Sequence, residues 1–285
     1  MAEQRKIRER IDATEKTYQI TNAMNMVSTS KLRRSQKTLL SFRPISDEIL
    51  GLTRDLVSAN PDLHHKALED SSAKPCYILI ASDRGLIGSY NVSLFKYFLD
   101  YVNKHHQSKD EFKVATIGYK AFSFAKKQGY EMINEDSANI RDDILFIDFE
   151  DVSSSVLEGY MEGTIGKTII FYNSFVNTLS SKINEYQLLP IKFMEAEEKK
   201  TEFLFEPNKK EILNTMVNLY VNYTLYRIIL EAKTSEHASR MTAMKNASDN
   251  AQEIEKRLTL LYNRARQNSI TTELIDIING SNAVN

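Results

Sequence analysis

The sequence lacks several features that define common classes of protein. It contains one cysteine, Cys76, so it cannot form an internal disulfide or a cysteine-based metal cluster by itself. No apolar run approaches the ~20 residues that a membrane-spanning helix requires. Its first forty residues mix acidic and basic side chains without an apolar core segment, which argues against a signal or transit peptide. We therefore expect a cytosolic chain without a bilayer-spanning segment.

Glycine and proline are also scarce, and they are unevenly placed. Seven of the nine glycines lie between Gly85 and Gly166, whereas residues 1–43 and 208–279 contain neither glycine nor proline. In both segments, a stripe of mostly apolar residues recurs at alternating spacings of four and three positions. This spacing is typical of the seam of a heptad coiled coil. The stripes are Ile7, Ile11, Thr14, Tyr18 and Thr21 near the start, and Ile212, Met216, Leu219, Tyr223, Tyr226 and Leu230 near the end. The pattern predicts two long helices, and Pro44 should kink or locally open the first.

The length of these helices bears on the fold. A helix over 208–279 would run on the order of 110 Å at 1.5 Å per residue, whereas a compact chain of 285 residues would be roughly 50 Å across. Chain order favours an antiparallel pair of terminal helices with a domain inserted between them. We predict an N-terminal coiled-coil helix over 1–59, an α/β domain over 60–207 and a C-terminal coiled-coil helix over 208–285.

The middle of the chain has a different pattern. Short apolar or β-branched runs predict strands, and amphipathic segments between them predict helices. The expected strands are 76–81, 113–117, 167–175 and an antiparallel strand within 183–193, and the expected helices are 92–105 and 121–128. This alternation favours a small, largely parallel sheet with helices on its faces, a Rossmann-like α/β domain.

Charge separates the same three parts. Residues 1–43 carry ten basic and four acidic side chains, and residues 208–285 carry ten basic and eight acidic ones. The remaining 164 residues hold 17 basic and 26 acidic side chains. A basic helix pair could meet nucleic acid, anionic lipid or acidic protein loops. An ordinary solvated helix face explains the same charge equally well.

No catalytic, cofactor-binding or metal-binding motif is evident. Residues 82–91 follow a predicted strand, where a phosphate-binding turn would lie, but they match neither glycine-rich phosphate motif. We interpret them as a tight turn in which Asp83 caps backbone groups and Arg84 faces a partner. The five histidines have no metal-site spacing, and the acidic residues between Glu135 and Asp151 lack EF-hand spacing and are interpreted as solvated surface.

The two ends of the chain resemble a known family. Residues 7–37, 235–251 and 262–283, with shorter matches at 82–86 and 175–178, resemble the gamma subunit of the F-type ATP synthase. The resemblance implies a central rotor shaft that couples proton-driven rotation to ATP synthesis or hydrolysis on the beta subunits. It implies alpha, beta and epsilon subunits and a membrane proteolipid ring as partners, with no nucleotide site, cofactor or catalytic residue in this chain.

The resemblance also implies interface residues. Met24, Arg240, Gln267 and Thr271 match positions that face the beta subunits, and Arg84 would lie at a subunit contact. Because the match begins at Ile7 with no presequence before it, we expect a bacterial enzyme on the cytoplasmic side of the plasma membrane. Such a chain would be peripheral and would touch the membrane only through its partners.

Two other classes of function stay open. A nucleic-acid-binding or scaffolding coiled coil with an α/β insert would use the basic first helix on phosphates, and its affinity would fall steeply with salt. A nucleotide-dependent α/β enzyme would need the turn at 82–91 to bind phosphate. A DNA shift assay and a nucleotide titration of the isolated chain distinguish these alternatives from a shaft.

Overall fold

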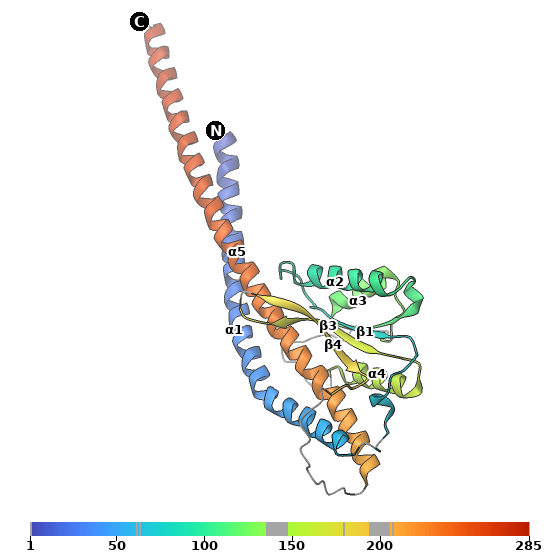
Figure 1. Ribbon diagram of the computed structural model, residues 1–285. Helices are drawn as coiled ribbons and strands as arrows, with labels where there is room; N and C mark the ends of the chain where they lie inside the picture. Colours follow the sequence, from blue (N-terminus) through green and yellow to red (C-terminus); the bar gives the residue numbers. More distant parts are fainter. Residues whose placement is uncertain are drawn as a thin grey trace. The chain divides into compact units, whose positions relative to one another are not determined.

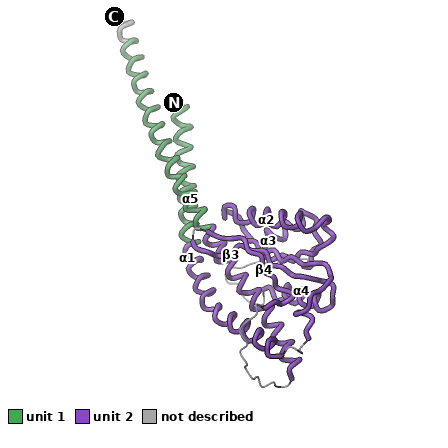
Figure 2. Tube along the Cα trace, in the orientation of Figure 1, with its two compact units in different colours: residues 1–28, 240–285 green, residues 29–239 purple. Residues whose placement is uncertain are grey.

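The computed structural model describes residues 2–60, 62, 64–134, 148–178, 180–193, 206 and 208–284. Two long helices, α1 (Ala2–Ser58) and α5 (Lys209–Val284), flank a sheet with shorter helices in the sequence (Figure 1). The chain divides into two units, shown in Figure 2: unit 1 contains residues 1–28 and 240–285, and unit 2 contains residues 29–239. The predicted fold class, paired terminal helices with an inserted α/β domain, is confirmed.

Unit 2 contains a four-stranded sheet in the order β2-β1-β3-β4. Its strands are β1 (Cys76–Ile80), β2 (Lys113–Ile117), β3 (Thr168–Phe175) and β4 (Ser181–Leu189). β1 is parallel to both β2 and β3, and β4 is antiparallel to β3. All four predicted strands are present. The last one begins earlier than predicted and ends at Leu189, before Pro190, whose nitrogen has no proton to donate to a ladder.

Alternate side chains of β1 belong to two different hydrophobic layers. Tyr77 and Leu79 pack with α2 (Tyr90–His105) and α3 (Tyr119–Gln128). Ile78 and Ile80 pack with α4 (Glu150–Glu162) and with the parts of α1 and α5 that belong to unit 2. Short 3-10 turns complete the unit at Lys66–Leu68 and Lys109–Glu111. The sheet is therefore covered on both faces, which explains why β1 is buried at every position.

The sequence interpretation missed α4. Its buried residues Val152, Val156 and Tyr160 and the partly buried Leu157 and Met161 lie among serines, glutamates and a glycine, so the segment resembles polar surface. Glu150 and Asp151 are not only solvated surface, because they form the acidic first turn of this helix. Acidic side chains at that position interact favourably with the positive end of the helix dipole. Asp148, just before the helix, is half-buried, and residues 135–147, which carry the remaining acidic positions of that segment, lie outside the described residues.

Within unit 2, α5 has two apolar faces where the sequence predicted one seam. The predicted stripe faces α1, where the ring of Phe42 lies 5.5 Å from that of Tyr223 and 4.7 Å from that of Tyr226. A second stripe is buried more deeply in the core that contains β1 and α4. Its members are Leu213, Val217, Tyr220, Val221, Leu225, Ile228 and Ile229. α1 runs through Pro44 as one helix.

In unit 1, α1 and α5 are antiparallel. The Ser248 hydroxyl donates to Thr21 Oγ1 at 2.8 Å, and the Gln4 amide donates to the carbonyl of Ala265 at 3.1 Å. These pairs join early residues of α1 to late residues of α5, so the helices run in opposite directions. The predicted stripe on α1 is confirmed, because Ile7, Ile11, Thr14, Tyr18 and Thr21 are half-buried and the residues between them are exposed.

Candidate functional site

The end of α5 in unit 1 extends beyond the α1 residues that the structure describes. Gln4 is bonded to Ala265 and, at 2.7 Å, to the Ser269 hydroxyl, while α1 begins only two residues earlier, at Ala2. The antiparallel pairing therefore leaves the last turns of α5 without a described α1 residue opposite them. We call residues 270–279 the terminal segment of α5.

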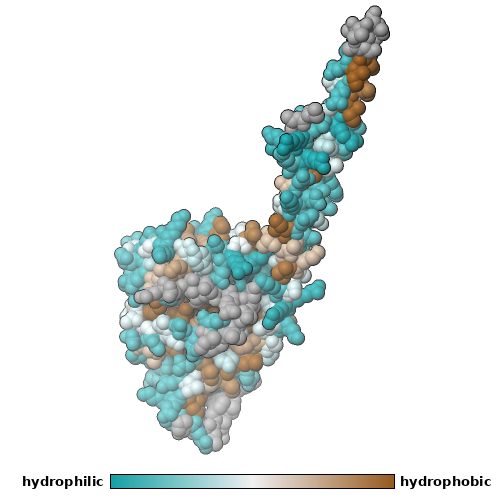
Figure 3. Space-filling model, turned by 180° about the vertical axis from the view of Figure 1, so that it is seen from behind, coloured by the Kyte–Doolittle hydropathy of each residue, from teal (hydrophilic) through white to brown (hydrophobic). Residues whose placement is uncertain are grey.

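The terminal segment exposes an apolar surface, seen as the brown side chains near the C-terminal end of unit 1 in Figure 3. Its exposed apolar residues are Ile270 (49%), Leu274 (55%), Ile275 (51%), Ile277 (67%) and Ile278 (57%). Its charged residues are Glu273 and Asp276. An apolar surface of this kind marks a binding site for another chain more often than a solvent face. The sequence interpretation did not identify these five residues.

The predicted interface residues lie at three places. Gln267 and Thr271 are exposed one helical turn apart, at the start of the terminal segment, and the Thr271 hydroxyl donates to the Gln267 carbonyl at 3.0 Å. Met24 and Arg240 are half-buried in unit 1, and Arg84 is exposed in unit 2. The structure thus brings Gln267 and Thr271 together with the apolar surface. The interface role of all five residues stays a prediction.

The turn over residues 82–91 is closed by its own hydrogen bonds. The Ser82 N–H donates to Asn91 Oδ1 at 3.2 Å, and the Asn91 amide donates back to the Ser82 hydroxyl at 2.9 Å. Asp83 Oδ1 accepts from the backbone N–H of Tyr119 at 2.9 Å, which confirms the predicted capping role. Leu86 is 60% exposed with a φ of 62°. Ser82 and Asn91 therefore satisfy each other within the turn, where a phosphate cradle would direct its donors at a ligand.

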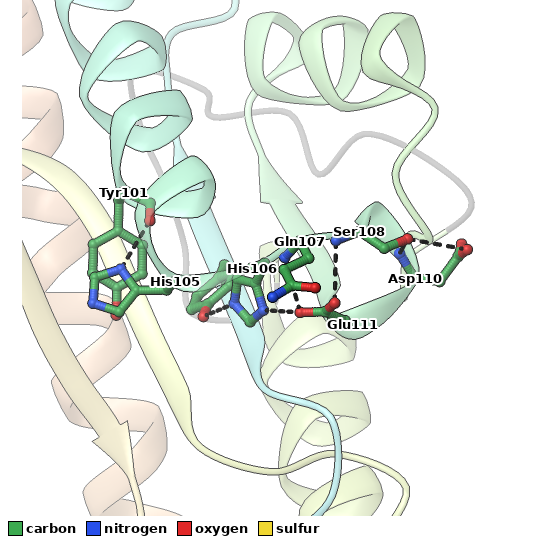
Figure 4. A network of polar contacts seen from close by, with 8 residues as sticks. Tyr101, His105, His106, Gln107, Ser108, Asp110 and Glu111 are labelled. Atoms are coloured by element: carbon green, nitrogen blue, oxygen red, sulfur yellow. Dashed lines mark hydrogen bonds and ion pairs between the residues drawn. The ribbon is translucent and has the colours of Figure 1, made fainter.

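The histidine at the end of α2 belongs to a structural network, shown in Figure 4. His106 Nε2 lies 2.7 Å from the Tyr77 hydroxyl, and His106 Nδ1 lies 3.2 Å from Glu111 Oε2. Glu111 also accepts from the backbone N–H groups of Gln107 and Ser108. These bonds, led by that of Gln107, hold the pKa of the Glu111 carboxyl below its usual range. The network joins β1, α2 and the turn Lys109–Glu111.

The single cysteine is placed for packing. Cys76 is fully buried, and burial raises the pKa of its thiol to about 12. A thiol with so high a pKa stays protonated at neutral pH and is a poor nucleophile and metal ligand. Among the described residues, no group of three or more histidine, cysteine, aspartate or glutamate side chains is placed to hold a metal ion.

Paired terminal helices, an inserted α/β domain and an exposed apolar helix end are features of a subunit of a larger assembly. A family model described as ATP synthase matches residues 3–284. The ATP synthase gamma chains of two Staphylococcus epidermidis strains are each 36% identical to this chain over 288 residues and are matched over their whole length. The chain belongs to the ATP synthase gamma chain family. The resemblance seen in the sequence is confirmed, and with it the assignment to a non-catalytic subunit of that enzyme.

Two solved structures share the fold. A chain of the Euglena gracilis mitochondrial ATP synthase rotor, in rotational state 1, has a TM-score of 0.64 and 18% identity, covering 94% of this chain and 99% of that one. A chain of the central stalk and c-ring of the Tetrahymena thermophila mitochondrial ATP synthase has a TM-score of 0.59 and 22% identity, covering 80% and 99%. None of the described helices has a stretch long and apolar enough to cross a membrane.

Proposed function

We propose that this gamma subunit is a rotor shaft whose terminal segment turns within a ring of alternating alpha and beta subunits. The observation that carries the proposal is the apolar surface of residues 270–279, which α5 exposes beyond its pairing with α1. Apolar contacts have no fixed direction, so a helix end of this kind can slide past successive neighbours without breaking strong ion pairs. The low charge of the segment, with Glu273 and Asp276 only, suits such a bearing.

The shaft would act by linkage. A single helix end inside a ring touches otherwise equivalent catalytic subunits in different ways, so it favours a different conformation in each of them. Rotation would then cycle the nucleotide affinity of every catalytic subunit. On this proposal the chain transmits mechanical work, and the bond chemistry takes place in its neighbours.

The further partners belong to the same proposal. The related solved chains come from a rotor and from a central stalk with its c-ring, which supports contact of this subunit with a membrane ring. Contact with the epsilon subunit is part of the proposal and rests on the resemblance seen in the sequence. Met24, Arg240, Gln267 and Thr271 would face the beta subunits, and Arg84 would lie at another subunit contact. The two Staphylococcus epidermidis gamma chains that are 36% identical to this chain are bacterial, which supports a peripheral location on the cytoplasmic side of a bacterial plasma membrane.

Co-expression with alpha and beta subunits tests the proposal. We expect the purified complex to contain one copy of this chain within each ring and to hydrolyse ATP. Replacing Leu274, Ile277 and Ile278 together by serine should lower ATPase activity per complex about tenfold, because the apolar bearing surface is lost. Thr272→Ser, on the same segment, is the matched control and should leave the activity unchanged. A complete ring that excludes this chain would contradict the proposal.

Arg240→Ala should also lower the ATPase activity of the complex. Arg257→Ala is its matched control, since Arg257 is an exposed residue of the same helix paired with Glu253 at 2.9 Å. Equal effects of the two substitutions would contradict the interface role of Arg240. A DNA shift by the isolated chain that weakens steeply with salt would support the nucleic-acid alternative instead.

A further inference from the structure

The seam between α1 and α5 in unit 1 ends at a pair of polar residues. Among the residues whose side chains are described, Gln4 is the first half-buried position of α1, and Ser269 is the last half-buried position of α5. The side-chain amide of Gln4 donates to the Ser269 hydroxyl at 2.7 Å and to the carbonyl of Ala265 at 3.1 Å. Every position of α5 from 270 to 279 is exposed. The contact between Gln4 and Ser269 therefore closes the seam where the terminal segment begins.

The two partners of Gln4 lie on the face of α5 that meets α1. The residues of this face in the last part of unit 1 are buried or half-buried, at spacings of four and three: Ala251, Glu255, Leu258, Tyr262, Ala265 and Ser269. Ala265 and Ser269 are four residues apart, so they are neighbours one helical turn apart. The amide of Gln4 thus joins two consecutive turns of α5. One of its two acceptors is a side-chain oxygen, which belongs to Ser269 alone.

The described start of α1 lies outside the apolar stripe of that helix. Glu3, Arg5 and Lys6 are exposed, and the stripe begins at Ile7. The first four N–H groups of a helix have no partner within the helix, so a first turn opens readily unless contacts from outside hold it. The two bonds made by Gln4 supply such a contact, because they connect the first turn of α1 to α5.

Opening of this turn would lengthen the part of α5 that has no partner. In Figure 2, α5 continues within unit 1 past the start of α1. If the first turn of α1 opened, the pairing would end at Ile7 and the unpaired part of α5 would grow by about one turn. A helix without a packed neighbour depends on its own marginal stability. The base of the terminal segment would then bend more easily.

We propose that Gln4 is a positioning residue that fastens the start of α1 to α5 and thereby sets the residue at which the helix pair ends and α5 continues alone. This inference rests on the proposed rotor function, in which the terminal segment turns within a ring of subunits. A terminal segment with a fixed base transmits torque to its neighbours with less bending than one whose base opens. On this proposal Gln4 acts through Ser269 and Ala265.

The first test measures the distance between the two helices in the full chain alone. Spin labels are attached to cysteines introduced by Glu3→Cys and Arg266→Cys, both at exposed positions of unit 1. The native Cys76 is fully buried, so the labels react with the introduced thiols. Gln4→Met removes the donor, keeps an unbranched side chain of similar length and adds no charge.

Gln19→Met is the matched control. Gln19 is an exposed residue of α1 in unit 1, and its side-chain amide donates to Glu15 of the same helix at 3.3 Å. The control therefore removes the same kind of donor without removing a bond to α5.

We expect a narrow distribution of distances between the labels in the parent chain and a broader one in Gln4→Met. The backbone amides of residues 6–10 should exchange with solvent roughly fivefold faster in this variant, because the bonds that oppose opening of the first turn are lost. Gln19→Met should keep the parent distribution. A distribution that Gln4→Met leaves unchanged, or that Gln19→Met broadens equally, would overturn the inference.

A reciprocal exchange tests whether Gln4 acts through Ser269. Gln4→Glu removes the donor and should broaden the distribution. Adding Ser269→Gln places a donor on α5 opposite the new acceptor on α1, so the double variant should recover the narrow distribution. A double variant as broad as Gln4→Glu alone would contradict the proposed bond.

The complex with alpha and beta subunits separates this inference from the proposed function. Gln4→Met should lower its ATPase activity by less than the triple serine replacement in the terminal segment does, because the apolar surface itself is intact. Unchanged ATPase activity would overturn the link between Gln4 and the rotor. If the parent chain fails to join the ring, the rotor function itself is wrong. If the parent complex hydrolyses ATP and Gln4→Met leaves the label distances unchanged, the rotor function stands and the role of Gln4 is wrong.

Discussion

The same two helices are stabilised differently in the two units. In unit 2, α5 is buried on two faces by α1 and by the α/β core, and Leu225 and Ile229 are completely buried. In unit 1, the buried side chains among the described residues are mostly small or polar: Ser28, Met244, Ser248 and Ala251. Several larger apolar residues of unit 1 are exposed, such as Leu260 at 70%. One stretch of the helix pair is built into a core, and the other leaves much of its apolar surface exposed.

The difference follows from the number of neighbours that each stretch has. A helix with one partner can bury only one stripe, whereas α5 in unit 2 has a helix on one face and a sheet domain on the other. Burial of apolar surface contributes about 25 cal/mol per Å², so unit 2 receives most of the stabilisation. Unit 1 depends more on intrinsic helix propensity, which the absence of glycine and proline over 208–279 supports.

The largest expected effect is on the core of unit 2. Ile229→Ala should lower the free energy of unfolding by about 3 kcal/mol, because a fully buried side chain is replaced by a cavity. Leu261→Ala in unit 1 should change it by less than about 0.5 kcal/mol, since Leu261 is 52% exposed. Urea denaturation of the isolated chain measures both. Equal losses would contradict the comparison of the two units.

A second prediction concerns local opening. In the isolated chain, backbone amides of α5 near Leu225 should exchange with solvent at least about 100-fold more slowly than those near Leu261. The reason is that opening unit 2 exposes a packed core, whereas opening unit 1 separates a half-buried seam. Hydrogen-exchange mass spectrometry resolves the two regions. Equal protection along α5 would show that the helix opens as one cooperative element.

A third prediction concerns the polar seam of unit 1. Ser248→Ala removes the hydroxyl that donates to Thr21 and should lower the free energy of unfolding of this region by about 1 kcal/mol. A double-mutant cycle with Thr21→Ala, followed by hydrogen exchange in unit 1, measures the coupling. Additive effects of the two substitutions would show that the hydrogen bond contributes nothing to holding the helices together.

The smallest effect depends on pH. Burial raises the pKa of Glu231, although Arg227, the Phe175 N–H and Arg43 favour its charged form. The folded chain therefore binds this proton more tightly than the unfolded chain does. The resulting stabilisation is fully present below the ordinary glutamate pKa of about 4.3 and is lost as pH rises through the raised folded value.

Glu231→Gln should abolish this pH dependence while keeping the size of the side chain. At neutral pH the variant should gain less than about 1 kcal/mol in free energy of unfolding, because the side chain is partly exposed. Urea denaturation at several pH values between 4 and 8 measures the effect, with Glu255→Gln on the same helix as control. A variant with the pH dependence of the parent would show that Glu231 is not the group responsible.

Much of the fold could be predicted from local pattern. β1, β2 and β3 are short apolar or β-branched runs beside polar turns, and such runs are recognisable because both faces of a covered sheet are apolar. α4 was missed because it is a short segment in which serine, glutamate and glycine lie among the apolar residues, although those apolar residues do recur at helical spacing. The second face of α5 was hidden for another reason. Its stripe is shifted by about one position from the first, so the two merge into a broadly apolar helix surface.

The candidate site was predictable only in part. Gln267 and Thr271 were identified from resemblance, but the apolar surface beside them depends on where α1 begins relative to α5, which is a matter of pairing register. Likewise, the capping role of Asp83 follows from its place after a strand. The bond between Tyr90 and Ala232 joins residues 142 positions apart, and no local pattern predicts it.

By itself, the sequence determined that the chain ends in two long helices around an α/β domain, because breaker-free segments and apolar spacing act over a few residues. It also determined the family, through matches near both ends. Only the tertiary structure decided which side of each helix is buried, at which residues the pairing of α1 with α5 ends, and which part of α5 packs against the α/β domain. Those features arise from contacts between distant residues, where burial and hydrogen bonding are settled jointly by several elements.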